Sequence, residues 1–130
     1  MTAEPSALVL VADDNAGIRD TSAAILRAVG YTVTEVPDGQ AALEELGQKP
    51  FGVALLDVQM PKRDGIAVVE ALASSTTTPV IMMLSAYDFD AELRERLDHR
   101  VYKYLKKPVP PTVLIDAMCE AAALSRAALA

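Results

Sequence analysis

The stretch VALLDVQMPKRDGIAVVEAL, residues 53–72, changes its hydrophobic pattern along its length. Its first part, Val53–Leu56, is a continuous apolar run, which is typical of a strand buried on both faces of a parallel sheet. A polar loop follows, and from Gly65 onward apolar residues recur at helical spacing. These residues are Ile66, Val69 and Leu72. The stretch therefore predicts a strand, a loop and a helix in succession.

The same unit repeats on both sides of this stretch. Further strands are predicted at Ala7–Ala12, Tyr31–Val36, Val80–Leu84 and Val101–Leu105. Helical spacing of apolar residues follows each of them, with cap-type residues such as Asp38 at the starts and Gly30 and Gly47 at the ends. The order βαβαβαβαβα indicates an α/β fold, a single doubly wound domain with a parallel sheet covered on both faces.

Length and composition limit the functions that the chain can have. Its 130 residues suit one domain, which we expect over residues 1–130. Eighteen acidic and twelve basic residues give a net charge of −6, which is unlike a domain that binds nucleic acid directly. No apolar run approaches the ~20 residues needed to cross a bilayer. Cys119 is the only cysteine, so no internal disulfide can form and we expect a cytoplasmic protein.

Polar side chains follow four of the predicted strands. They are Asp13, Asp14, Asn15, Asp57, Ser85 and Lys107. Parallel strands bring their carboxyl ends to one edge of the sheet, where such folds bind ligands. Three carboxylates at that edge repel one another and need a cation, and oxygen ligands without Cys or His favour Mg²⁺ or Mn²⁺. We therefore expect a magnesium site there.

Each of these residues has a simpler explanation when it is taken alone. An Asp after a strand is most often a helix cap, a Ser is most often a turn residue, and a Lys is usually solvated. Their joint arrival at the ends of several strands favours a functional site over these explanations.

Four segments carry a resemblance to a known family. VADDN, LLDVQMPKRDG, PVIMMLSA and YLKKP resemble the receiver (CheY-like) domain of bacterial two-component response regulators, from about Leu8 to the final helix. The resemblance implies a flavodoxin-like (βα)5 domain with a five-stranded parallel sheet of order 2-1-3-4-5. Lys107–Pro108 resembles the cis-peptide site of that family.

The resemblance also implies a phosphorylation chemistry. Asp57 would accept a phosphoryl group from a phosphohistidine on a sensor histidine kinase or a histidine phosphotransfer protein. Ser85 and Lys107 would contact phosphoryl oxygens after the transfer. A receiver promotes only its own phosphorylation and dephosphorylation, so the chain is expected to be a signalling domain and not an enzyme in the usual sense.

Metal and switch residues follow from the same resemblance. Asp13 and Asp14 would hold Mg²⁺, Asp14 directly, and Asp57 with the backbone carbonyl of Gln59 would complete the protein ligands. Ser85 and Tyr104 would couple the pocket to the face formed by the fourth helix, fifth strand and fifth helix. A downstream protein target would bind that face.

The fifth strand and last helix depart from the family pattern. Lys103 lies on the strand, and Asp116 and Glu120 lie on the helix. The acid–base pairs through which many DNA-binding regulators dimerise are therefore not expected on this face.

Three other functions compete with a phosphorylatable receiver. An FMN-binding flavodoxin-like protein needs a phosphate-cradling loop after the first strand, whereas Asp13-Asp14-Asn15 would repel a phosphate. Aspartyl-phosphate hydrolases carry an Asp-x-Asp motif that begins at the nucleophile. Here Gln59 stands where the second Asp of that motif would be. A degenerate receiver that only docks is disfavoured because every pocket residue is present. The sequence does not decide between a stand-alone receiver and a piece of a larger regulator or hybrid kinase.

Overall fold

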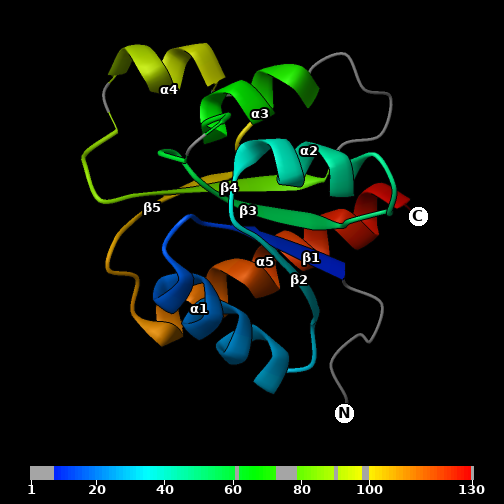
Figure 1. Cartoon of the computed structure of the whole chain (residues 1–130). Coiled ribbons are helices and arrows are strands. Elements are labelled where there is room, and N and C mark those ends of the chain that lie inside the picture. Colours follow the sequence, from blue (N-terminus) through cyan, green and yellow to red (C-terminus); the bar gives the residue numbers. More distant parts are fainter. Residues whose placement is uncertain (1–7, 61, 73–78, 90, 98–99, 130) are drawn as a thin grey trace.

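A computed structural model describes residues 8–60, 62–72, 79–89, 91–97 and 100–129. Strands and helices alternate along the whole of this part of the chain (Figure 1). The elements are β1 (Leu8–Ala12), α1 (Ala16–Ala28), β2 (Thr32–Val36), α2 (Gly39–Leu46), β3 (Val53–Asp57), α3 (Gly65–Leu72), β4 (Val80–Ser85), α4 (Ala91–Leu97), β5 (Lys103–Lys106) and α5 (Pro111–Leu129). Ala7, the predicted start of the first strand, lies outside the described residues.

The five strands form one parallel sheet of order β2-β1-β3-β4-β5. Helices α1 and α5 cover one face, and α2, α3 and α4 cover the other (Figure 1). The predicted α/β fold class and strand order are therefore confirmed. The described helices include none that is both long enough and apolar enough to span a membrane.

Alternate residues of each central strand enter two separate cores. In β3, Val53 and Leu55 pack toward α1 and α5, whereas Ala54 and Leu56 pack toward α2, α3 and α4. Successive strand side chains point to opposite faces, so a strand covered on both sides must be apolar at every position. The unbroken apolar run at residues 53–56 has this physical origin.

Five strand boundaries differ from the sequence prediction. β2 begins at Thr32 and not at Tyr31, and β5 ends at Lys106 and not at Leu105. β3 and β4 each include one more residue, because Asp57 and Ser85 still pair with the neighbouring strands. β5 begins at Lys103 and not at Val101, because the Val101 amide donates to the Leu97 carbonyl and completes the turn that ends α4. Val101 is buried in the core from that turn, which explains why its apolar side chain looked like part of a strand.

Candidate functional site

Three carboxylates meet at the carboxyl edge of the sheet. Asp13 follows β1 and Asp57 ends β3, and the ligand oxygens that these two residues and Asp14 offer all lie within 4.8 Å of one another. Asp13 and Asp57 are buried, whereas Asp14 is exposed. The predicted convergence at neighbouring strand ends is thus present in the structure.

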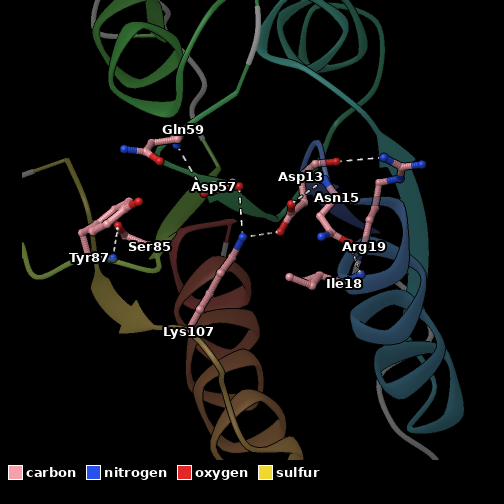
Figure 2. Close-up of polar contacts among 9 residues, drawn as sticks. All are labelled: Asp13, Asn15, Ile18, Arg19, Asp57, Gln59, Ser85, Tyr87 and Lys107. Atoms are coloured by element: carbon pink, nitrogen blue, oxygen red, sulfur yellow. Dashed lines mark hydrogen bonds and ion pairs between the residues drawn. The ribbon is translucent and has the colours of Figure 1, made fainter.

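Lys107 reaches the same place from the segment after β5. Its Nζ lies 2.8 Å from Asp13 Oδ2 and 3.0 Å from Asp57 Oδ2 (Figure 2). The Lys107 side chain is only 13% exposed, so its ammonium spans the two buried carboxylates with little access to water. One ammonium facing three carboxylates leaves an excess of negative charge at this edge. The Lys107–Pro108 peptide bond is cis, as the resemblance implied.

Burial and neighbouring charges shift the pKa values of this pair. Burial raises the pKa of the Asp57 carboxyl, and the charge of Asp13 raises it further against the opposing bond from Lys107. Burial alone would lower the pKa of the Lys107 ammonium, but Asp13 and Asp57 outweigh it and the net shift is upward. Lys107 therefore stays protonated, and the carboxylates remain short of positive charge.

Hydrogen bonds hold Asp13 in one orientation. The Asp13 amide donates to the Val36 carbonyl at 3.2 Å, and Asp13 Oδ1 accepts from the Asn15 amide at 2.9 Å. The helix cap of α1 is Asn15, whose Oδ1 accepts from the Ile18 amide at 3.0 Å. The cap explanation for Asp13 and Asp14 is therefore wrong, because Asn15 performs that role.

The loop after Asp57 approaches this residue closely. The Gln59 amide donates to Asp57 Oδ1 at 3.2 Å, and the Gly65 amide donates to the Val58 carbonyl at 2.9 Å. A Cβ atom at Gly65 would lie 2.4 Å from the Asp57 carbonyl oxygen, a distance that no side chain tolerates. Glycine at position 65 thus lets α3 start directly behind the Asp57 backbone.

Ser85 and Tyr104 lie on neighbouring strands beside this cluster. Ser85 is buried at the end of β4, and its Oγ accepts from the Tyr87 amide at 3.0 Å (Figure 2). The Tyr104 ring lies between α4 and the sheet, with its centroid 4.8 Å from that of Phe89 and 4.8 Å from the Arg94 guanidinium carbon. The two predicted switch residues are therefore close in the sheet, and Tyr104 contacts the α4 region directly.

Sequence reasoning did not single out Arg19 or Glu35. Arg19 Nη1 donates to the Asp13 carbonyl at 2.8 Å, and its Nε lies 3.7 Å from Glu35 Oε1. The available signal was positional: Arg19 lies one turn beyond Asn15 in the predicted first helix. Nothing in the local pattern indicated that its side chain turns back toward the loop.

Known proteins are similar to this chain over most of its length. The chain matches the response regulator receiver domain family over residues 9–119, and it belongs to that family. It is 33% identical to the transcriptional activator protein PfeR of Pseudomonas aeruginosa over 129 residues, 97% of this chain and 42% of PfeR. It is 36% identical to the transcriptional regulatory protein PdtaR of Mycobacterium tuberculosis over 111 residues, 85% of this chain and 54% of PdtaR.

Solved structures agree with the family. The chemotaxis response regulator CheY4 of Vibrio cholerae is 28% identical with a TM-score of 0.81, covering 88% of this chain and 98% of CheY4. The receiver domain of NarL from Mycobacterium tuberculosis is 31% identical with a TM-score of 0.80, covering 90% and 96%. The chain is thus a receiver domain of the two-component response regulators, which favours the receiver over the flavin-binding alternative. It spans about half the length of the curated relatives named above.

Proposed function

We propose that this receiver accepts a phosphoryl group on Asp57 from a phosphohistidine of a sensor histidine kinase or a histidine phosphotransfer protein. The observation that carries the proposal is the position of the Asp57 carboxylate, which ends a central strand 3.0 Å from Lys107 Nζ and within the cluster of Asp13 and Asp14. Neither a capping role nor a packing role requires an ammonium and three carboxylates at one sheet edge.

The transfer needs little from the protein beyond alignment and charge. An oxygen of the ionised Asp57 carboxylate attacks phosphorus, the P–N bond breaks, and its electron pair stays on the imidazole nitrogen, which then takes a proton from water. No general base is required because a carboxylate nucleophile carries no proton to remove. Charge spread over the equatorial phosphoryl oxygens needs hydrogen-bond donors and positive charge, which the Ser85 hydroxyl and the Lys107 ammonium would supply.

The residues present fit a magnesium ion. The ligand set is oxygen only, and the side-chain oxygens of Asp13, Asp14 and Asp57 lie close enough to share one cation. We assign these three carboxylates and the backbone carbonyl of Gln59 as the residues that would hold Mg²⁺, with Mn²⁺ as the other ion such ligands accept. When bound, the ion supplies the positive charge that Lys107 alone does not provide.

Ser85 and Tyr104 are proposed to carry the signal outward. Phosphorylation of Asp57 adds negative charge, and the Ser85 hydroxyl, whose Oγ accepts from the Tyr87 amide at 3.0 Å, still has a proton to donate to a phosphoryl oxygen. Movement of Ser85 toward that oxygen would draw the connection between β4 and α4 with it. A shift of the segment that connects β4 to α4 would change the packing around Phe89 and thereby the position of the Tyr104 ring. The face formed by α4, β5 and α5 would then bind a downstream protein differently.

The same proposal covers the extent of the domain, its partners and its location in the cell. Residues 1–130 form a single receiver domain, and the net charge of −6 argues against direct contact of this domain with nucleic acid. PfeR and PdtaR are named as transcriptional regulators, and each is about twice as long as the matched part. Any output on transcription would therefore come from a partner or a further segment. A single cysteine fits a cytoplasmic location.

Acetyl phosphate with Mg²⁺ tests the assignment of Asp57. The wild type should gain ~80 Da, the mass of one phosphoryl group, in intact-protein mass spectrometry, and EDTA should suppress the gain. Asp57→Asn should gain nothing. Asp88→Asn, which makes the same chemical change at an exposed carboxylate, is the matched control and should label like the wild type. Equal labelling of Asp57→Asn and wild type would reject the assignment.

The switch is read in the same preparation. Beryllofluoride, which stands in for the phosphoryl group on Asp57, should shift the NMR resonances of both the pocket and Tyr104 in the wild type. In Ser85→Ala the pocket resonances should still shift and those of Tyr104 should respond much less. A full Tyr104 response without the hydroxyl would remove Ser85 from the switch.

A further inference from the structure

The backbone carbonyl of Asp13 has an unusual position. Asp13 lies between the end of β1 at Ala12 and the start of α1 at Ala16, so neither the strand ladder nor the helix supplies a partner for this carbonyl. The residue is fully buried, and a buried carbonyl without a partner is costly. The partner is Arg19, whose Nη1 donates to this oxygen at 2.8 Å (Figure 2).

An acidic residue of the sheet, Glu35, holds the Arg19 side chain in place. Its Nε lies 3.7 Å from Glu35 Oε1, and the Arg19 and Glu35 side chains are 18% and 21% exposed. Glu35 belongs to β2, and its other oxygen, Oε2, pairs with Arg27 Nη1 at 2.8 Å. The guanidinium therefore links the loop that carries the acidic pair to the edge strand of the sheet.

These contacts engage every hydrogen-bonding group of Asp13 except one carboxylate oxygen. Its amide is bonded to the Val36 carbonyl, its carbonyl to Arg19 and its Oδ1 to the Asn15 amide. Only Oδ2 remains, and it faces Lys107 Nζ at 2.8 Å inside the acidic cluster. Groups that orient a metal-holding side chain without touching the metal commonly change metal affinity 10–100-fold when they are removed.

We propose that Arg19 is a positioning residue that fixes the direction of the Asp13 carboxylate and thereby sets the affinity of the acidic cluster for a divalent cation. The proposal rests on the function proposed above, because it takes Asp13, Asp14 and Asp57 as the cation site. Glu35 shares its single negative charge between Arg19 and Arg27, so the charge of the Arg19 guanidinium and its geometry are separated by substitution.

Two substitutions separate geometry from charge. Arg19→Lys keeps the positive charge but lacks the planar fork that bonds the Asp13 carbonyl and reaches Glu35 together. Arg19→Met removes both charge and fork while keeping the aliphatic stem. Arg27→Met is the matched control, because Arg27 makes the same two kinds of contact, to Glu35 at 2.8 Å and to the Val33 carbonyl at 2.9 Å, at a site away from Asp13.

The experiment is a Mg²⁺ titration of the 130-residue chain followed by the amide resonances of Asn15 and Gln59. Both Arg19 variants should bind Mg²⁺ about tenfold more weakly than wild type, and Arg27→Met should bind within about twofold of it. The Asn15 amide, which reports the Asp13 Oδ1 bond, should shift in the metal-free Arg19 variants only. Urea titrations of all four proteins establish that each is folded under these conditions.

Two results would overturn the inference. If Arg19→Lys binds Mg²⁺ like the wild type while Arg19→Met binds it more tightly, the guanidinium acts only through its charge. If both variants and Arg27→Met weaken binding equally, the effect is a general loss of stability. A wild type that binds no Mg²⁺ would instead reject the proposed cation site itself, which is a different failure.

Discussion

Two consecutive lysines at the end of β5 have opposite surroundings. Lys106 Nζ lies 2.6 Å from Asp88 Oδ1, in a pair whose side chains are 58% and 85% exposed. Lys107 Nζ lies 2.8 Å from Asp13 and 3.0 Å from Asp57, and the three side chains are 13%, 1% and 7% exposed. The three distances are similar, so the two lysines differ in burial and in the number of carboxylates that each contacts.

The backbone explains why neighbours have such different environments. Ser85 pairs with Lys106 at the end of β5, and the Ser85 carbonyl accepts from the Lys107 amide at 2.8 Å, so hydrogen bonding to β4 continues one residue past the strand. Successive side chains of an extended chain point to opposite sides. Water and mobile side chains weaken an exposed pair, whereas a buried ion without a partner is costly. The comparison predicts that the same substitution has very different effects at positions 106 and 107.

The largest effect is expected for Lys107→Met in the absence of Mg²⁺. Removing the ammonium leaves Asp13 and Asp57 facing each other in a buried site, and such a loss typically costs about 3 kcal/mol. Urea unfolding followed by circular dichroism measures this loss as a lower midpoint. Lys106→Met is the control, and its midpoint should match the wild type within experimental error. Equal midpoints for the two variants would show that burial does not separate the two pairs.

A smaller effect of opposite sign is expected for Asp13→Asn. The amide oxygen can still accept from the Asn15 amide, and Lys107 keeps one carboxylate, Asp57, as its partner. We expect a gain of about 1 kcal/mol without metal, below the ~4 kcal/mol of two charges 4 Å apart at an effective dielectric of 20, because Lys107 loses one contact. Mg²⁺ should bind about tenfold more weakly or worse.

Asp14→Asn sharpens this prediction within the same cluster. Asp14 is exposed, so water already screens its charge and the urea midpoint without metal should hardly change. Mg²⁺ affinity should still fall, because a ligand is lost. If Asp13→Asn lowers the metal-free midpoint, crowding of carboxylates does not destabilise the metal-free protein.

Much of the fold and of the acidic cluster could be predicted from sequence because burial leaves a direct record. Strands covered on both faces must be apolar throughout, which made Val53–Leu56 and Val80–Leu84 easy to recognise. Parallel strands then bring their ends together, so Asp13, Asp57 and Lys107 could be placed at one edge from their order alone.

Contacts that depend on the direction of a side chain could not be predicted from the sequence pattern. Asn15 and the two acidic residues before it are all common cap residues, and only the geometry of the first turn shows that Asn15 is the cap. Arg19 looked like any polar residue on an exposed helix surface, because its bond to the Asp13 carbonyl depends on the side chain turning back toward the loop before α1. The bond from the Val101 amide to the Leu97 carbonyl could not be predicted either, which is why β5 begins two residues later than predicted.

The face of α4, β5 and α5 illustrates both kinds of information. Its departure from the family pattern at Lys103 and Glu120 was readable from the sequence. The structure adds that these two residues pair within the chain, with Lys103 Nζ 3.0 Å from Glu120 Oε1, and that the Tyr102 hydroxyl donates to the same oxygen at 2.9 Å. Lys103, Tyr102 and Glu120 therefore form an exposed cluster of polar contacts, in contrast to the buried cluster around Lys107.

The smallest effect is therefore expected for Glu120→Gln, and it should depend on pH. The bonds from Lys103 and Tyr102 hold the pKa of the Glu120 carboxyl below its ordinary value of 4.5. A pKa that is lower in the folded state contributes stability above pH 4.5, and that contribution is lost as pH falls through the folded value. The urea midpoint of the wild type should exceed that of Glu120→Gln slightly at pH 7 and approach it below pH 4.5. Added salt should shrink the difference at pH 7, because both partners are exposed. Glu95→Gln, at an exposed carboxylate on α4, provides the control for general loss of one negative charge. A wild-type advantage that stays constant from pH 3 to pH 7 would mean that Glu120 acts through packing of its side chain and not through its charge.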